Sequence, residues 1–376
     1  MYTHYIHTDF YSKFLFVSSF RLTFFTYMCE KKLRIPALYI LFYFLMYFPE
    51  KSLLAHVNSN NDRLQQTFIP GKIVPEIHLK RFPVQEYALF LPSRYRAGTP
   101  LPLIIFFDPH GEGGIPVTKY ASLAEHYGYI LAASNSSRNG LDLRSANAIA
   151  SNLVEDLSER FSIRDGKVAI CGLSGGAKVA MGFAESRREF PTVIYCGAVT
   201  QIQPNHRLNF LGFAGTHDMN YADLVAFDMA LNGSGFSHFL IQWNGKHEFP
   251  SPPVFEDAFR FLETGGIPNY GQKRVTITQA ELDREQAIRQ KYLEAFQTKN
   301  LDWWRSEVNA LNKKKDILNE RLLGFISLAC YSYISGALNM KNIEAAQYIL
   351  NIYRMADPAN TAIRDFEVQL KKKPSR

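Results

Sequence analysis

A serine flanked by glycines follows an apolar segment near the middle of the chain. Residues 168–171 are apolar, and Gly172-Leu173-Ser174-Gly175-Gly176 comes directly after them. A G-x-S-x-G turn between a strand and a helix holds its serine on a sharp, strained corner, where the helix N-terminus favours negative charge. Turns of small residues also occur there for structural reasons alone. The pattern nevertheless predicts that Ser174 is a nucleophile.

An activated serine needs a base, and the base needs an acid that orients it. Downstream of Ser174, the apolar run 207–215 leads to Asp218, and a second run, 236–243, is followed by His247. In a parallel sheet both residues would lie just beyond the carboxyl end of a strand, at the same edge as the serine. We predict that His247 takes the serine proton and that Asp218 orients and stabilises the imidazole.

Other histidines and aspartates compete for these roles. His206 precedes the acid and breaks the order Ser, Asp, His, and His238 lies inside a strand, where packing is the simpler role. His217 adjoins the proposed acid, and neighbouring side chains on one loop rarely both point inward. Asp223 and Asp228 fall in the helical stretch that follows, where we expect solvated carboxylates. The pair named above is therefore favoured.

Stabilising an oxyanion requires two N–H donors. The first would be the Gly175 amide, directly after the serine. The second is expected in the loop after the apolar strand 101–107, which contains His110-Gly111 and further glycines. An ordinary turn or a phosphate cradle would use similar residues, but the absence of a following Gly-Lys-Ser/Thr excludes a Walker loop. We predict that the second donor lies at Gly111 or His110.

Residues 86–262 resemble the α/β-hydrolase superfamily, and within it the secreted esterases related to polyhydroxybutyrate depolymerases, feruloyl esterases and dienelactone hydrolases. The resemblance is carried by four motifs: His110-Gly111, Gly172–Gly176, Gly215-Thr216-His217-Asp218 and His247-Glu248-Phe249-Pro250. It implies a serine esterase with Ser174, Asp218 and His247 as its triad, acting on a small-molecule or polymer ester. Glu112 stands where the depolymerase-like branch usually has an uncharged residue, which leaves the substrate subfamily open.

Two other functions fit the same residues. A serine peptidase of the prolyl-oligopeptidase type shares this triad, although no propeller-like β domain precedes the hydrolase-like segment. The alternative from another class is a catalytically silent hydrolase fold that recruits a protein partner through its helical C-terminal region. A complete set of Ser, Asp and His in the expected order argues against the silent protein, because a binding protein has no need of it.

The rest of the pattern predicts the scaffold. Strand-like and helix-like segments alternate over residues 84–264, which predicts an α/β fold with a mostly parallel sheet and helices on both faces. Residues 56–83 are expected to be an irregular lead-in. Residues 275–376 are expected to be all helical. Within them, 324–360 resembles one tetratricopeptide unit, with Gly336 at a position for close helix packing, and a plain helical bundle is the other interpretation.

The N-terminus has the pattern of a targeting segment. Lys31, Lys32 and Arg34 precede the apolar run 35–48, and Ala55 offers a small residue for cleavage. This run is short for a transmembrane helix. Residues 1–55 are therefore predicted to be a secretory signal of a secreted or periplasmic protein, with an uncleaved anchor as the alternative. A translation start at Met28 would make residues 1–27 a misassigned start.

The composition limits the remaining classes of protein and kinds of binding site. The chain has 376 residues, of which 47% are hydrophobic and 20% charged, which is typical of a globular protein with a sizeable core. No basic stripe with interleaved aromatic residues is present, so nucleic-acid binding is not predicted. Cys171 and Cys196 on apolar strands are expected to be free thiols or a disulfide. Neither a zinc-type cysteine spacing nor H-E-x-x-H occurs, and no metal or cofactor is predicted.

Overall fold

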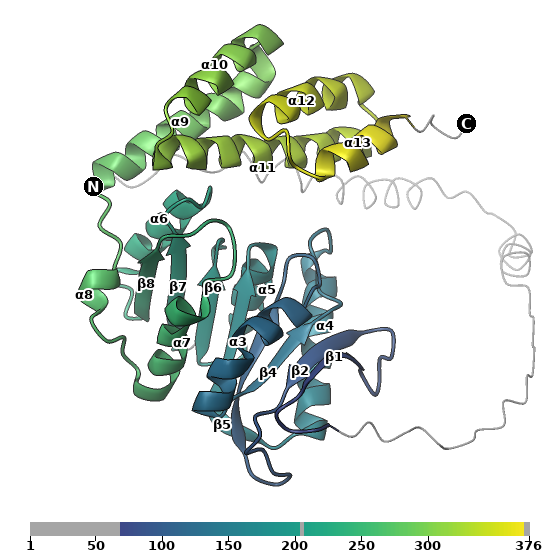
Figure 1. Ribbon diagram of the computed structural model, residues 1–376, viewed down its shortest axis with the longest axis vertical. Helices are drawn as coiled ribbons and strands as arrows, with labels where there is room; N and C mark the ends of the chain where they lie inside the picture. The colour runs from purple at the N-terminus through teal and green to yellow at the C-terminus, as the bar shows by residue number, and fades with distance from the viewer. Residues whose placement is uncertain (1–67, 204–206, 372–376) are drawn as a thin grey trace, which may run out of the picture. The chain divides into compact units, whose positions relative to one another are not determined.

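The computed structural model describes residues 68–203 and 207–371; the predictions for the signal segment, Met28 and His206 lie outside this range. The described residues contain a sheet of eight strands in the order β1-β2-β4-β3-β5-β6-β7-β8 (Figure 1). Strand β2 is antiparallel to its neighbours β1 and β4, and all other pairs are parallel. The strands are β1 (Ile73–His78), β2 (Glu86–Phe90), β3 (Leu101–Phe107), β4 (Ile130–Ser134), β5 (Ile163–Leu173), β6 (Thr192–Cys196), β7 (Asn209–Gly215) and β8 (Ser237–Trp243). The sheet is mostly parallel, as predicted for an α/β-hydrolase fold.

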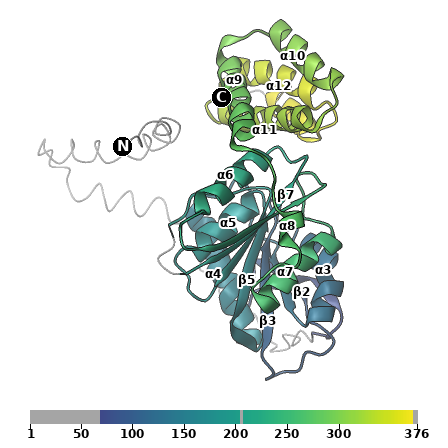
Figure 2. The same cartoon turned by 90° about the vertical axis from the view of Figure 1, so that its left-hand side faces the viewer.

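Helices cover both faces of the sheet (Figure 2). One face carries α3 (Gly114–Tyr127) and α7 (Pro252–Thr264), and the other carries α4 (Leu143–Arg160), α5 (Gly175–Ala184) and α6 (Tyr221–Leu231). Because side chains alternate along a strand, β3 supplies Ile104 and Phe106 to the first core and Ile105 and Phe107 to the second. The sheet is thus buried on both sides, which explains its nearly continuous apolar strands.

Strand β1 lies within residues 56–83, where we expected an irregular lead-in, so that expectation is wrong for residues 73–78. Ile73 pairs with Phe90 and His78 with Glu86, with a register shift between them. This strand was not predicted because Pro75 interrupts the alternating pattern, and a proline usually argues against a strand. On an outer strand it is tolerated, since one side of its backbone has no partner strand.

Strand β8 is the other edge of the sheet, and the segment after α7 covers part of it. Arg274 forms an isolated antiparallel bridge with Ile241 of β8. The Tyr270 hydroxyl, on the short helix α8 (Tyr270–Lys273), accepts a hydrogen bond from the Leu240 N–H at 3.0 Å. Backbone groups of β8 that face away from β7 are therefore partly satisfied.

The C-terminal region is helical, as predicted, and its helices are α9 (Gln279–Thr298), α10 (Leu301–Lys313), α11 (Ile317–Asn339), α12 (Ile343–Ala356) and α13 (Ala362–Lys371). Helix α9 begins with the capping box formed by Thr278 and Glu281. By length and composition α11 is the one helix among the described residues that is apolar enough to cross a membrane. It also supplies buried residues to the core of this region, among them Ile326 and Ile334, as the central helix of a soluble bundle would.

The proposed role of Gly336 in close packing is not what the structure shows. A Cβ placed on Gly336 would meet no heavy atom within 4 Å. The glycine of α11 with a close neighbour is Gly324, where a Cβ would lie 3.0 Å from the Cβ of Met219 in the hydrolase-fold part. The tetratricopeptide assignment stays a prediction.

Cys171, Cys196 and Cys330 are buried and free, so the disulfide alternative is wrong. Burial raises the pKa of the Cys171 thiol, and the neighbouring Cys196 raises it further. These thiols pack as small apolar groups.

Candidate active site

Ser174 stands at the corner between β5 and α5 with φ 53° and ψ −122°. A residue with a side chain is strained in this region of backbone space. The corner closes because its flanking glycines have no side chains. A Cβ on Gly172 would collide with the backbone of Gly176, and one on Gly176 would collide with the carbonyl oxygen of Phe107. The G-x-S-x-G motif thus forms the predicted turn, and Ser174 is half-buried at its apex.

The structure brings His247 and Asp218 together. His247 Nδ1 lies 2.9 Å from Asp218 Oδ1. The carboxylate is buried, with 1% of Asp218 exposed, and the same oxygen accepts a hydrogen bond from the Asn220 N–H at 2.8 Å. An acceptor at Nδ1 holds the proton on that nitrogen and leaves Nε2 free to act as a base.

One turn connects the serine to this pair. The Ser174 N–H donates to the carbonyl oxygen of Cys196, the last residue of β6, at 2.9 Å. Gly197 follows with φ 66°, and a Cβ there would lie 2.9 Å from His247 Nδ1 and 3.1 Å from Asp218 Oδ2. Ser174 and the His247–Asp218 pair therefore border the same turn, at the carboxyl ends of β5, β7 and β8.

The competing histidines face other partners. His217 Nδ1 lies 2.6 Å from Glu320 Oε2 of α11, so His217 and its neighbour Asp218 point in different directions, as expected. His238 Nδ1 lies 2.8 Å from Asp228 Oδ1. Asp228 is thus a partner of a strand residue, and our expectation of a merely solvated carboxylate is wrong for it.

Asp223 is solvated as expected, with 42% of its side chain exposed, but it also has a protein partner. Both of its carboxylate oxygens accept hydrogen bonds from the guanidinium of Arg289 in α9, at 3.0 and 2.7 Å. Sequence reasoning missed this pair because its partners lie far apart along the chain.

The predicted loop donors of the oxyanion hole, the N–H groups of Gly111 and His110, already have acceptors, so their assignment stays a prediction that this geometry does not favour. The carboxylate oxygen Oδ1 of Asp108 accepts the N–H groups of His110 at 2.8 Å and Glu112 at 3.2 Å. The Gly111 N–H points at the carbonyl oxygen of Asp108, 3.3 Å away. An aspartate at the end of a strand makes such turns readily. In contrast, the Gly175 N–H at the start of α5 has no acceptor among the described residues, as is usual in a first helical turn.

A cavity of about 300 Å³ opens beside Gly175. Its apolar wall includes Leu141, Leu143, Val179 and Ile202, and its polar wall includes Asp108, Arg138, Asn139, Lys178 and Glu185. Leu143 is 63% exposed, so this part of the wall is open to solvent. The arrangement provides an apolar surface next to the proposed nucleophile.

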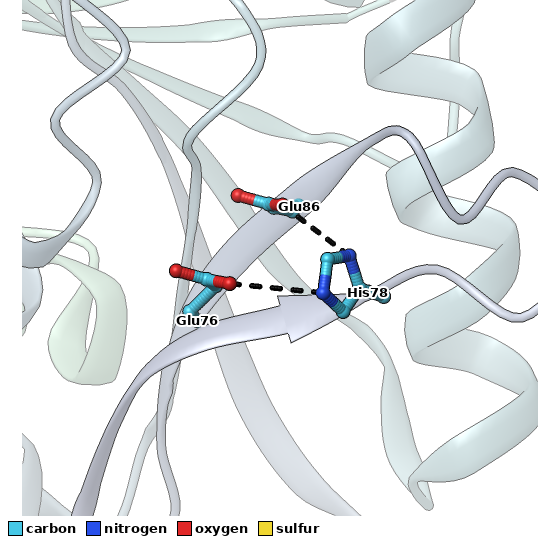
Figure 3. Close-up of side chains that lie close together, drawn as sticks. All are labelled: Glu76, His78 and Glu86. Carbon is cyan, nitrogen blue, oxygen red and sulfur yellow. Dashed lines mark ion pairs between the residues drawn. The ribbon is translucent and has the colours of Figure 1, made fainter. Parts of the chain in front are cut away.

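A separate cluster of Glu76, His78 and Glu86 lies on β1 and β2 (Figure 3). Glu76 faces Nε2 of the imidazole at 3.6 Å, and Glu86 faces Nδ1 at 3.3 Å. Nδ1 also lies 2.8 Å from the carbonyl oxygen of Pro83. One ligand atom from each of the three residues lies within 4.8 Å of the other two, and groupings of exposed acidic residues like this one are also common where no ion binds.

Helix α11 contacts the loop that carries the acid. Arg321 donates from Nη1 to the carbonyl oxygen of Thr216 at 3.1 Å. The same guanidinium forms a buried ion pair with Glu285 of α9 and lies 4.4 Å from the ring centre of Tyr221. Burial raises the pKa of Tyr221 to about 12. No local sequence pattern could have revealed these contacts, since they join segments far apart in the chain.

Comparisons with known proteins give likenesses in shape only. No family model and no curated protein sequence matches the chain. Among solved structures, an S-formylglutathione hydrolase from Staphylococcus aureus is similar, with a TM-score of 0.42 and 13% identity over 51% of this chain and 97% of its own. A ferulic acid esterase from Anaeromyces mucronatus has a TM-score of 0.41 and 13% identity, over 51% of this chain and 89% of its own. An acylaminoacyl peptidase from Pyrococcus horikoshii has a TM-score of 0.39 and 14% identity, over 54% and 42%.

Proposed function

We propose that this chain is a serine hydrolase that cleaves carboxylic esters through an acyl-enzyme, with Ser174, His247 and Asp218 as its triad. The observation that carries the proposal is the 2.9 Å contact between His247 Nδ1 and the buried Asp218 carboxylate, which borders the same turn as a strained serine. A serine nucleophile, a histidine base and an aspartate that orients the base are what nucleophilic acyl transfer requires.

The reaction follows from the positions of these groups. Ser174 Oγ attacks the ester carbonyl carbon while its proton passes to Nε2 of His247, and the carbonyl oxygen becomes an oxyanion. Asp218 stabilises the imidazolium that forms. The tetrahedral adduct then expels the alcohol, which takes the proton from Nε2, and leaves an acyl-serine. Water repeats the sequence and releases the carboxylic acid and the free serine.

The cavity beside Gly175 favours a substrate that carries an apolar group. Leu141, Leu143, Val179 and Ile202 would lose contact with water when such a group binds, and burial of apolar surface contributes about 25 cal/mol per Å². Because the N-terminal pattern is that of a secretory signal, the proposal extends to an enzyme that acts outside the cytoplasm.

Fluorophosphonate labelling of the full chain tests the proposal, because this reagent reacts with activated serines. We expect labelling of the wild type and none of Ser174→Ala. Ser186→Ala is the matched control, since Ser186 is exposed just beyond α5, and it should label like the wild type. Hydrolysis of p-nitrophenyl acetate should follow the same pattern.

Three outcomes would redirect the proposal. A folded wild type that does not label would contradict it and favour a binding protein that recruits a partner through the helical region. Labelling of Ser174→Ala at the wild-type rate would show that another serine is the nucleophile. Faster cleavage of peptide amides than of esters would favour a serine peptidase.

A further inference from the structure

The proposed reaction leaves one donor unassigned. The oxyanion formed on attack requires two hydrogen bonds, and the Gly175 N–H supplies one. The loop after β3 cannot supply the other as it stands, because Asp108 accepts its His110 N–H. Gly113, further along that loop, faces β4, because a Cβ there would collide with the carbonyl oxygen of Ala133.

A side chain from a different loop lies against Gly175. Asn139 belongs to the loop between β4 and α4, and its own N–H donates to the carbonyl oxygen of Pro109 at 2.8 Å. If Gly175 carried a Cβ, that atom would collide with the carboxamide oxygen of Asn139 and would lie 3.5 Å from Nδ2. The three heavy atoms nearest to that position all belong to Asn139.

The side-chain carboxamide of Asn139 is available for a hydrogen bond to a substrate. None of the hydrogen bonds between described residues involves Oδ1 or Nδ2 of Asn139, and the residue is exposed at the cavity wall. Half a turn about the terminal torsion exchanges the oxygen and the NH₂ group, because this torsion is broad and roughly two-fold. The NH₂ group can therefore face the space beside the Gly175 N–H without any change in the backbone.

We propose that Asn139 Nδ2 is the second donor of the oxyanion hole. The inference rests on the proposed function and assigns Asn139 a catalytic role in it. A carboxamide N–H suits the task because it is neutral in the ground state and strengthens its hydrogen bond as the carbonyl oxygen becomes charged. The hydrogen bond from the Asn139 N–H to the Pro109 carbonyl oxygen keeps the Asn139 backbone next to the corner that carries Ser174.

The first test is the replacement of Asn139 by Ala and by Asp in the full chain. Both variants lose the donor, and Asp keeps the shape of the side chain. We expect kcat for p-nitrophenyl acetate to fall about 10²- to 10³-fold, the effect of removing one oxyanion donor, with KM nearly unchanged. Asn244→Ala is the matched control, because Asn244 is an exposed asparagine outside the cavity, and it should keep the wild-type kcat.

A second test separates this role from a structural one. A trifluoromethyl ketone forms a hemiketal on the serine, and its oxyanion would occupy the same hole. Its inhibition constant should rise in parallel with the loss of kcat in Asn139→Ala. The midpoint of thermal unfolding should stay within a few degrees of the wild-type value, because the side chain is exposed.

Gly175→Ala tests the contact from the other side. This variant keeps the amide N–H of residue 175, but its methyl group occupies the position of the Asn139 carboxamide. We expect a loss of kcat similar to that of Asn139→Ala. The double variant should be little worse than either single variant, because both remove the same interaction.

The results distinguish the inference from the proposed function. A wild type that is active, together with an Asn139→Ala variant of wild-type kcat and unchanged inhibition constant, would overturn the inference and leave the proposed function in place. A folded wild type that neither labels nor hydrolyses the ester would overturn both.

Discussion

Arg321 donates a hydrogen bond to the carbonyl oxygen of Thr216 at 3.1 Å, two residues before Asp218. Its guanidinium is also paired with Glu285, which is 1% exposed. A buried ion pair is costly to break, because the remaining charge has no partner. The helical region and the acid loop are thus tied together by a charged group that cannot be removed without penalty.

Arg321→Met should lower both stability and activity. Loss of one partner of a buried pair typically costs about 3–5 kcal/mol, so urea unfolding should show a reduction of that order in the free energy of unfolding. The value of kcat should also fall, because the Thr216–Asp218 loop loses its anchor. Adding Glu285→Gln should recover part of the stability, since it removes the stranded charge. An unchanged kcat in the folded single variant would show that α11 stabilises the chain without positioning Asp218.

The strain at Ser174 predicts a difference between two inactive variants. Glycine adopts positive φ freely, whereas alanine at φ 53° remains strained. Ser174→Gly should be more stable than Ser174→Ala by about 1 kcal/mol, from a strain relief of about 1–3 kcal/mol less about 0.5–1 kcal/mol of backbone entropy. Equal free energies of unfolding in urea for the two variants would contradict a strained backbone at Ser174.

The two histidines next to the acid loop should behave differently on substitution. His247→Ala removes the proposed base and should lower kcat for p-nitrophenyl acetate by about 10³-fold or more. His217→Ala removes an outward contact with Glu320 and should change kcat less than about twofold, because exposed ion pairs contribute little. The opposite result would show that His217 is the base.

The buried thiol of Cys330 predicts a dependence of stability on pH. Burial raises the pKa of Cys330 in the folded chain, so the thiol ionises first in the unfolded chain. Its contribution to stability is complete below the unfolded pKa of about 8.5 and is lost as pH rises above it. The free energy of unfolding should therefore fall between pH 8 and pH 10, and less steeply in Cys330→Ala. Identical slopes would contradict this assignment.

Local patterns predicted the strands and helices of the hydrolase fold well, because each apolar run is ended by a turn of glycine, proline or polar residues. They also predicted that His247 and Asp218 would meet, since residues after parallel strands gather at one edge of the sheet. They could not show that Asp108 accepts the His110 N–H, because nothing in the order of residues reveals that contact.

Contacts between distant segments could not be predicted from the sequence for the same reason. Arg321 and Thr216 lie on different elements, and their meeting depends on how the helical region packs on the loop. Asn139 is an unremarkable residue in a polar loop until the fold places it against Gly175. Periodicity and motifs fix local structure, whereas such pairs are decided by tertiary packing.

Both margins of the sheet have features that discourage intermolecular pairing. At β8, the Arg274 bridge and the Tyr270 hydroxyl occupy backbone groups that another chain would need. At β1, Pro75 lacks an N–H donor, and the carboxylate of Glu76 places charge beside it. Exposed strand margins are templates for aggregation, and proline, charge and covering segments suppress it. We therefore expect the folded chain to resist growth into β-linked fibrils, even though its strands are almost wholly apolar.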